Sequence, residues 1–357
     1  MTVSQVYGYM PPRTNKDGLS FEQYKQLASQ PYAQRKFGFG QDADLTSPLT
    51  AATISTPAQF LQSWLPGTVY TITQARKADE ILGTQTVGSW EDEEIVQVFL
   101  EQTGEAVPYQ DNTQVQYSDW NPNFERRTIV RFELGYQVNR LEAARAAKMN
   151  QSSDQNKQGA CANGLEIMRN LVSFYGFADG ENRTFGLLND PGLIGYINSP
   201  AGAGGDTEFS TKTVNERIES LLLLFQALID QSGTIVDPMT QETTLSVPSS
   251  IITTFGDINE FGVSVNSWLK ENYPKMRVET VPQFNEANGG AAVMYLIADK
   301  VVDSGTDGGL VASQLIPTKM FSLGTEQRTK GYVQDYSNAT AGVLVTRPYA
   351  VARMSGV

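Results

Sequence analysis

The sequence predicts an α+β fold in which an extended β-ribbon and one long helix precede a compact α/β part. Three observations lead to this prediction. Strand-like stretches separated by turn residues fill much of 68–138. Apolar side chains recur at helical spacing over 153–175, a length of about 35 Å at 1.5 Å per residue. Helix-like and strand-like segments then alternate from residue 213 to residue 298.

The composition argues against an enzyme. The chain has 357 residues, no histidine and a single cysteine, Cys161. These counts exclude a Ser-His-Asp triad, an internal disulfide and a cysteine-rich metal site. No apolar run approaches the roughly 18 residues of a membrane-spanning helix. We therefore predict a structural protein with no cofactor, no metal and no membrane contact.

The net charge of −12 restricts the kind of partner. A chain with this balance repels nucleic acid over long distances, so it is not a basic nucleic-acid binder. It is compatible with a container wall that lies near packed DNA without sequence-specific contact. Solubility alone explains the charge equally well.

The first part of the chain reads as an arm followed by a ribbon. In the arm, residues 1–67, short helices are predicted at 20–29 and 57–64. In the ribbon, residues 68–135, strands are predicted at 95–101 and 113–120. A further strand at 127–138 places alternate residues from Val130 to Val138 on one face. A ribbon that is polar on much of both faces is not stable alone, so we expect it to lie across another subunit.

Residues 136–197 are predicted to be mainly helical. A short helix at 141–149 is followed by a long helix at 153–175, capped by Ser152 or Ser153. The expected buried stripe of the long helix consists of Cys161, Leu165, Met168, Val172 and Tyr175. Cys161 is expected to be a buried core thiol, because no histidine is present to activate it.

Residues 198–308 are predicted to form the α/β part, and residues 309–357 to add closing strands. The clearest helix is 213–229, which begins with a capping box of Thr213 and Glu216. Its expected stripe is Ile218, Leu221, Leu222, Phe225, Leu228 and Ile229. A second helix is predicted at 258–270, with Phe261, Val265, Trp268 and Leu269 on one side. Strands are predicted at 244–247, 277–281 and 292–298.

Two polar motifs invite ligand-binding interpretations that the spacing does not support. The stretch from Ala203 to Asp206 is glycine-rich but lacks the Gly-Lys-Ser/Thr end of a phosphate loop, so we predict a surface loop. The acidic run from Glu91 to Glu94 lacks the spaced ligands of a calcium loop. It is expected to be solvated or to face a partner, such as the Arg126-Arg127 pair of a neighbouring subunit.

The order of these segments resembles the major capsid proteins of tailed bacteriophages, which share the Hong Kong 97-type fold. The most specific stretches are Gly104-Glu-Ala-Val-Pro-Tyr-Gln-Asp111, Asn139-Arg-Leu-Glu-Ala-Ala-Arg-Ala-Ala147 and Phe174-Tyr-Gly through Gly186-Leu-Leu-Asn189. The resemblance implies an N-terminal arm (1–67), an extension loop (68–135) and a peripheral domain with a spine helix (136–197). It also implies an axial domain (198–308) and closing strands of the peripheral domain (309–357).

The function that this resemblance implies is assembly, not catalysis. Hexamers and pentamers of the chain would form an icosahedral virion shell around double-stranded DNA, assembled in the bacterial cytoplasm. Expected partners are the chain itself, a portal protein, an optional decoration protein and a scaffolding protein. The scaffolding protein is expected to be separate, because the numbering begins at Met1 with no long helical pro-segment.

We expect subunit contacts at charged and aromatic positions of the ribbon. These are Glu91, Asp92, Glu93, Glu94, Glu105, Tyr109, Asp111, Arg126 and Arg127. Two alternatives stay open at this stage. One is an encapsulin-like compartment with the same fold and a protein cargo; the other is a carboxylate-dependent hydrolase, for which the sequence offers no motif.

Overall fold

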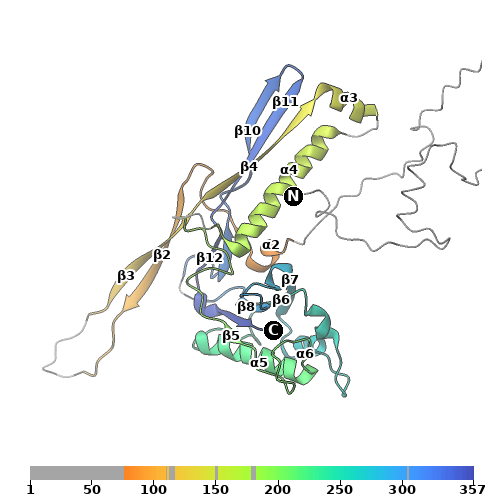
Figure 1. Cartoon of the computed structure of the whole chain (residues 1–357). Helices are drawn as coiled ribbons and strands as arrows, with labels where there is room; N and C mark the ends of the chain where they lie inside the picture. Colours follow the sequence, from red (N-terminus) through yellow and green to blue (C-terminus); the bar gives the residue numbers. More distant parts are fainter. Residues whose placement is uncertain (1–75, 110, 112–116, 149–151, 178–181, 304) are drawn as a thin grey trace, which may run out of the picture. The chain divides into compact units, whose positions relative to one another are not determined.

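The computed structural model describes residues 76–109, 111, 117–148, 152–177, 182–303 and 305–357 (Figure 1). These residues fall in one compact unit, Thr71–Val357. The predicted arm helices at 20–29 and 57–64, and positions 113–116 of the predicted strand at 113–120, lie outside the described residues.

The ribbon consists of β2 (Glu94–Thr103) and β3 (Asp119–Thr128), which form a two-stranded antiparallel sheet of their own. Their register runs from the Glu94↔Thr128 pair to the Thr103↔Asp119 pair. The strand predicted at 95–101 is confirmed. Of the described positions in the strand predicted at 113–120, Asp119 and Trp120 are in a strand and 117–118 are not: β3 starts at Asp119 and continues past Pro122 to Thr128. Proline is tolerated there because both strands of a two-stranded ribbon are edge strands.

The strand predicted at 127–138 is two strands that pair with different partners. β3 ends at Thr128, and β4 (Val130–Asn139) pairs with β11 (Gly331–Thr340). Between them, the Ile129 amide donates to the carbonyl oxygen of Glu93 at 2.8 Å. The predicted single apolar face is therefore interrupted: Ile129 is buried, whereas Leu134 is 41% exposed.

The long helix α4 (Ser153–Tyr175) has the bounds predicted for the helix at 153–175. The Ser152 hydroxyl caps it by accepting from the amide of Gln155. The helix packs on the three-stranded sheet β10-β11-β4, in which β10 covers Thr318–Arg328, and α3 (Arg140–Lys148) precedes it (Figure 1). Cys161 is buried as predicted; its thiol donates to the Leu134 carbonyl at 2.9 Å, and burial raises its pKa.

The end of the predicted spine stripe is wrong by one residue. Tyr175 is 49% exposed, and Phe174 is fully buried in its place. The cause is the Gly-Leu-Leu-Asn turn, which folds back against the end of the helix. The amides of Leu187 and Leu188 donate to the carbonyls of Ser173 and Phe174 at 2.9 and 3.0 Å. A Cβ atom on Gly186 would lie 2.5 Å from the Phe174 backbone, so only glycine fits there.

The α/β part is built on a five-stranded mixed sheet of order β5-β13-β8-β6-β7. Its central strands are buried along their whole length and form the main core with the helices. The predicted strands at 244–247, 277–281 and 292–298 are confirmed as β6, β7 and β8. The strand bounds are β5 Ile197–Asn198, β13 Val351–Ser355, β8 Val293–Ala298, β6 Thr243–Pro248 and β7 Met276–Val281.

Helix α5 (Val214–Gln231) begins with the predicted capping box of Thr213 and Glu216. Of the predicted stripe, Leu221, Phe225 and Leu228 are buried, and Ile218 and Ile229 are half-buried. Leu222 is 43% exposed, whereas Leu224, which was not predicted, is fully buried.

Helix α6 (Val265–Asn272) is shorter than the helix predicted at 258–270. Ser264 caps it, and the residues before it form a tight turn closed by a bridge between Ile258 and Ser264. Gly262 has a φ of +77° in this turn, a conformation that an α-helix does not contain. Phe261 is therefore 84% exposed and does not lie on the packed side of the helix.

A group of short elements contacts the long helix α4. A small sheet of order β1-β9-β12 lies beside α2. Arg169 of α4 binds both Asp79 of α2 and Gln314 of β9, at 2.7 and 3.0 Å. The bounds are α2 Ala78–Leu82, β1 Thr84–Gln85, η4 Ile252–Gly256, η5 Pro282–Phe284, β9 Ala312–Leu315, β12 Val343–Val345 and η6 Pro348–Ala350.

Candidate intersubunit contact surface

One face of the β2–β3 ribbon is apolar and exposed. Alternate residues of a strand share a face, and the observed register sets the apolar residues of the two strands opposite one another. Leu100 is 65% exposed and Trp120 is 59% exposed. We call this surface the apolar ribbon face; it consists of Val96, Val98, Leu100, Trp120, Pro122 and Phe124.

The opposite face of the ribbon is mostly polar. It presents Gln97, Glu101, Asn121, Asn123 and Glu125 together with two apolar residues, Phe99 and, at the base of the ribbon, the buried Ile95. The prediction that both faces are largely polar is therefore wrong. The reason is the position of the second strand: pairing with 119–128 places Phe124 opposite Val98, and Trp120 opposite Gln102 on the same face. The alternation of apolar residues at 96, 98, 100 and at 120, 122, 124 is the sequence signal that was missed.

The base of the ribbon is fixed by a buried arginine. Arg127 donates to Asp190 at 2.8 Å and to the Val343 carbonyl at 3.3 Å, and it also pairs with Glu125. Its guanidinium lies 5.0 Å from the centre of the Phe185 ring. The side chains of Arg127 and Asp190 are both 3% exposed. Arg127 has almost no surface to offer a neighbour, and we leave it out of the proposed contact set.

A second arginine fixes the segment that leads into the ribbon. Arg131 donates to the carbonyls of Trp90 and Asp92 at 2.7 and 2.6 Å, and it also lies over the Trp90 ring. The Trp90 ring stacks on Phe321 with centroids 5.0 Å apart. Asp92, in turn, accepts from the Ser89 amide at 2.8 Å. Arg131 thus holds the backbone of the acidic run in place. The side chains of Glu91, Glu93 and Glu94 are exposed to solvent.

The remaining predicted contact residues stay at the surface. Arg126 lies 3.8 Å from Glu94 within the same ribbon, an exposed pair of little energetic weight. Glu105, Tyr109 and Asp111 are exposed beyond the end of β2, with Tyr109 at 90%. The structure brings Glu94 and Arg126 together in one chain.

The glycine-rich stretch at 203–206 is the predicted surface loop. The Ala203 amide donates to the carboxylate of Glu216 at 2.6 Å. Glu216 therefore closes this loop in addition to its role in the capping box of α5. Within the part of the chain that the structure describes, no group of acidic or cysteine side chains could hold a metal ion. Likewise, none of the described helices has the length and apolar character to cross a membrane.

The comparisons with known proteins decide between the families. A model of the Pa193 gp26 major capsid protein family matches residues 47–356. The chain belongs to this family. No curated protein sequence matches this major capsid protein.

Solved capsid structures share its fold. The capsid protein of the Myoviridae phage XM1 superposes with a TM-score of 0.67 at 16% identity, covering 84% of this chain and 98% of that chain. A native GTA particle capsid gives 0.55 at 12% identity, with coverages of 86% and 99%. Mycobacterium phage Ogopogo gives 0.53 at 7% identity, with coverages of 84% and 98%. The α+β fold is therefore the Hong Kong 97-like capsid fold, as predicted.

These matches establish a tailed-phage major capsid protein, a shell-forming structural protein that assembles with itself and is not an enzyme. Its location is the virion capsid. The encapsulin-like alternative is the weaker one.

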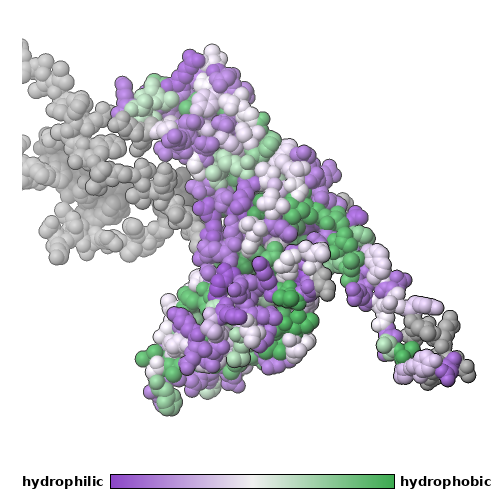
Figure 2. All heavy atoms as spheres, turned by 180° about the vertical axis from the view of Figure 1, so that it is seen from behind, coloured by the Kyte–Doolittle hydropathy of each residue, from purple (hydrophilic) through white to green (hydrophobic). Residues whose placement is uncertain are grey.

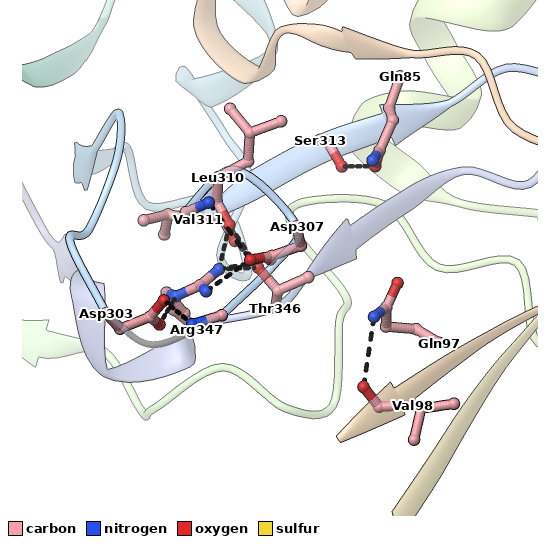
Figure 3. A network of polar contacts seen from close by, with 12 residues as sticks. Gln85, Gln97, Val98, Asp303, Asp307, Leu310, Val311, Ser313, Thr346 and Arg347 are labelled. Atoms are coloured by element: carbon pink, nitrogen blue, oxygen red, sulfur yellow. Dashed lines mark hydrogen bonds and ion pairs between the residues drawn. The ribbon is translucent and has the colours of Figure 1, made fainter. Parts of the chain in front are cut away.

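An arginine clamp in this capsid protein closes the loop between β8 and β9. Arg347 lies between Asp303 and Asp307, at 2.6 and 2.7 Å, and also donates to the Leu310 carbonyl (Figure 3). The Arg347 side chain is 8% exposed. The guanidinium holds the pKa of both aspartates below their usual range.

This clamp predicts an acid dependence of stability. Because the folded-state pKa values are depressed, the stabilisation is complete above the unfolded pKa of about 3.9 and is lost as the pH falls through the folded values. Asp307→Asn is expected to destabilise the unassembled subunit at pH 7, and the difference from the native chain is expected to shrink below about pH 4. Urea unfolding between pH 7 and pH 3 measures this. Asp206→Asn, in the exposed loop, is the control; a deficit for Asp307→Asn that persists unchanged at pH 3 would contradict the assignment.

Proposed function

We propose that this capsid protein forms rings of five and six subunits that close into an icosahedral shell around double-stranded phage DNA. In each ring the apolar ribbon face of one subunit lies on its neighbour. The observation that carries the proposal is the row of exposed apolar side chains on a ribbon that pairs with no other strand among the described residues. A two-stranded ribbon of this kind is marginal in water until its apolar face is covered.

The chemistry of the ribbon supports a contact with another copy. Burying apolar surface contributes about 25 cal/mol per Å², so covering the apolar ribbon face stabilises the assembled state. Rings arise when one surface binds a different surface on the next copy and the rotation closes. The rim of the proposed contact carries Glu91, Asp92, Glu93, Glu94, Glu105, Tyr109, Asp111 and Arg126.

Domain roles and further partners follow from the same proposal. Residues 1–67 act as an arm, 68–135 as the extension loop, 136–197 with 309–357 as the peripheral domain, and 198–308 as the axial domain. Strand β13 (Val351–Ser355) is the exception, because it pairs with β8 in the five-stranded sheet and therefore belongs with the axial domain. Assembly takes place in the bacterial cytoplasm with a separate scaffolding protein, a portal protein and an optional decoration protein. The net charge of −12 is compatible with a shell that encloses DNA without binding it tightly.

Electron microscopy of the purified chain tests this function. After size-exclusion chromatography, with and without a co-expressed scaffolding protein, we expect closed shells or rings of five or six. Shells that carry nucleic acid fit the phage role, whereas shells filled with protein cargo would favour the encapsulin-like alternative. A chain that stays monomeric with the scaffolding protein present would overturn the proposal.

A further inference from the structure

An aromatic side chain protrudes from the α/β body in a rigid turn before α6. Phe261 is 84% exposed and its neighbour Ile258 is 70% exposed. Hydrophobic residues are visible at the lower left tip of the molecule in Figure 2, where the loop beside α6 in Figure 1 lies. Glu260 stands between the two, is exposed, and makes no ion pair with any described residue. We call Ile258, Glu260 and Phe261 the knob.

The knob is held in shape by its own hydrogen bonds. The Asn259 side chain accepts from the amides of Phe261 and Val263 at 3.0 and 2.9 Å. The Asn259 amide donates to the Val263 carbonyl at 3.0 Å, and its side chain reaches Asn215 of α5 at 3.3 Å. An exposed aromatic that is already ordered loses little conformational entropy when a partner covers it.

A cleft with complementary properties lies along one side of α6. Its volume is about 300 Å³, and it runs from Asn266 in the first turn of α6 to the start of β7. The cleft is lined by Asn266, Leu269, Lys270, Tyr273, Pro274, Met276 and Val278. Most of these side chains are apolar. Lys270 lies at its rim, and Lys275 is beside it, exposed and bonded to the Thr240 carbonyl.

We propose that the knob of one subunit inserts into the cleft of the next subunit around the ring. The inference rests on the proposed function and adds the axial contact to it. The apolar knob matches the apolar cleft, and Glu260 matches the lysines at the cleft in charge. Helix α6 has eight residues and is about 12 Å long; the knob precedes its first turn, and the cleft extends along its side to the residues after its last turn. The knob and the cleft are two different surfaces of one subunit, as a head-to-tail ring contact needs.

Assembly of Phe261→Asp tests the knob. We expect this variant to need at least a tenfold higher subunit concentration to form shells, as for a central aromatic at an interface. Its unfolding should match the native chain, because the side chain is exposed in the subunit. Leu223→Asp, which changes an apolar residue 42% exposed on α5, is the matched control and should assemble normally. The inference would be overturned if Phe261→Asp and Leu223→Asp lost assembly to the same extent, or if both assembled normally.

A charge exchange tests the pairing of the two surfaces. Glu260→Lys and Lys270→Glu should each weaken assembly, and the double variant should restore it. In a separate double variant, Glu260→Cys with Lys270→Cys, mild oxidation of assembled shells should give a ladder of linked chains up to five or six. Neither single cysteine variant should give it.

The outcomes separate this inference from the proposed function. Native-looking shells that give no ladder, with no rescue by the charge exchange, would leave the shell role intact and reject the knob-and-cleft contact. Failure of the unmodified chain to form shells would reject the proposed function first.

Discussion

Replacing Arg127 with alanine is expected to lower the free energy of unfolding of the unassembled subunit by about 3–5 kcal/mol. The guanidinium and the carboxylate of Asp190 are both 3% exposed and 2.8 Å apart. Removing the arginine leaves a buried carboxylate without its partner, and the contacts to Val343 and Phe185 are lost with it. Urea unfolding at pH 7 measures the loss.

The next residue in the same strand provides the matched control for Arg127. Arg126 is 60% exposed and pairs with Glu94 at 3.8 Å. Arg126→Ala is expected to change the free energy of unfolding by less than about 1 kcal/mol. Equal effects of the two substitutions would show that Arg127 does not anchor the ribbon.

Replacing Phe124 with aspartate is expected to prevent shell formation while leaving the subunit folded. The side chain is 54% exposed in the subunit, so its free energy of unfolding should change by no more than about 0.5 kcal/mol. In the proposed contact the new carboxylate would be desolvated without a partner, which costs several kcal/mol per interface. Electron microscopy and sedimentation report assembly, and thermal unfolding reports the fold.

The control for Phe124 is its neighbour on the polar ribbon face. Asn123→Asp introduces the same charge one residue away, on the opposite side of β3. It should assemble as the native chain does. If Phe124→Asp forms normal shells, the apolar ribbon face is not a subunit contact.

Helices and their caps were predictable from the sequence because their signals are local. The caps at Ser152 and Thr213 and the bounds of the spine helix depend on residues within one turn of each other. The α6 error has a local cause as well: Gly262 and the Ser264 cap outweigh the apolar spacing that starts at Ile258.

Strand pairing depends on residues far apart in the chain, and the sequence did not determine it. No residue near Ile129 indicates that the pairing partner changes there. β3 pairs with β2, whereas β4 pairs with β11, which lies about 200 residues later in the sequence. Arg127 reads as a surface charge because its partners, Asp190 and Val343, are distant in sequence. Each half of the apolar ribbon face is an alternation in the sequence, but only the register of β2 and β3 shows that the two halves form one face.

The most direct measurement is the reactivity of single cysteines on the two faces of the ribbon before and after assembly. Val98→Cys lies on the apolar ribbon face and Gln97→Cys on the polar one, while the native Cys161 is buried. We expect maleimide to label both engineered thiols rapidly in the unassembled subunit. In the assembled shell, labelling at position 98 should slow at least tenfold while position 97 stays reactive. Equal labelling of position 98 in subunit and shell would contradict the proposal that a neighbouring subunit covers this face.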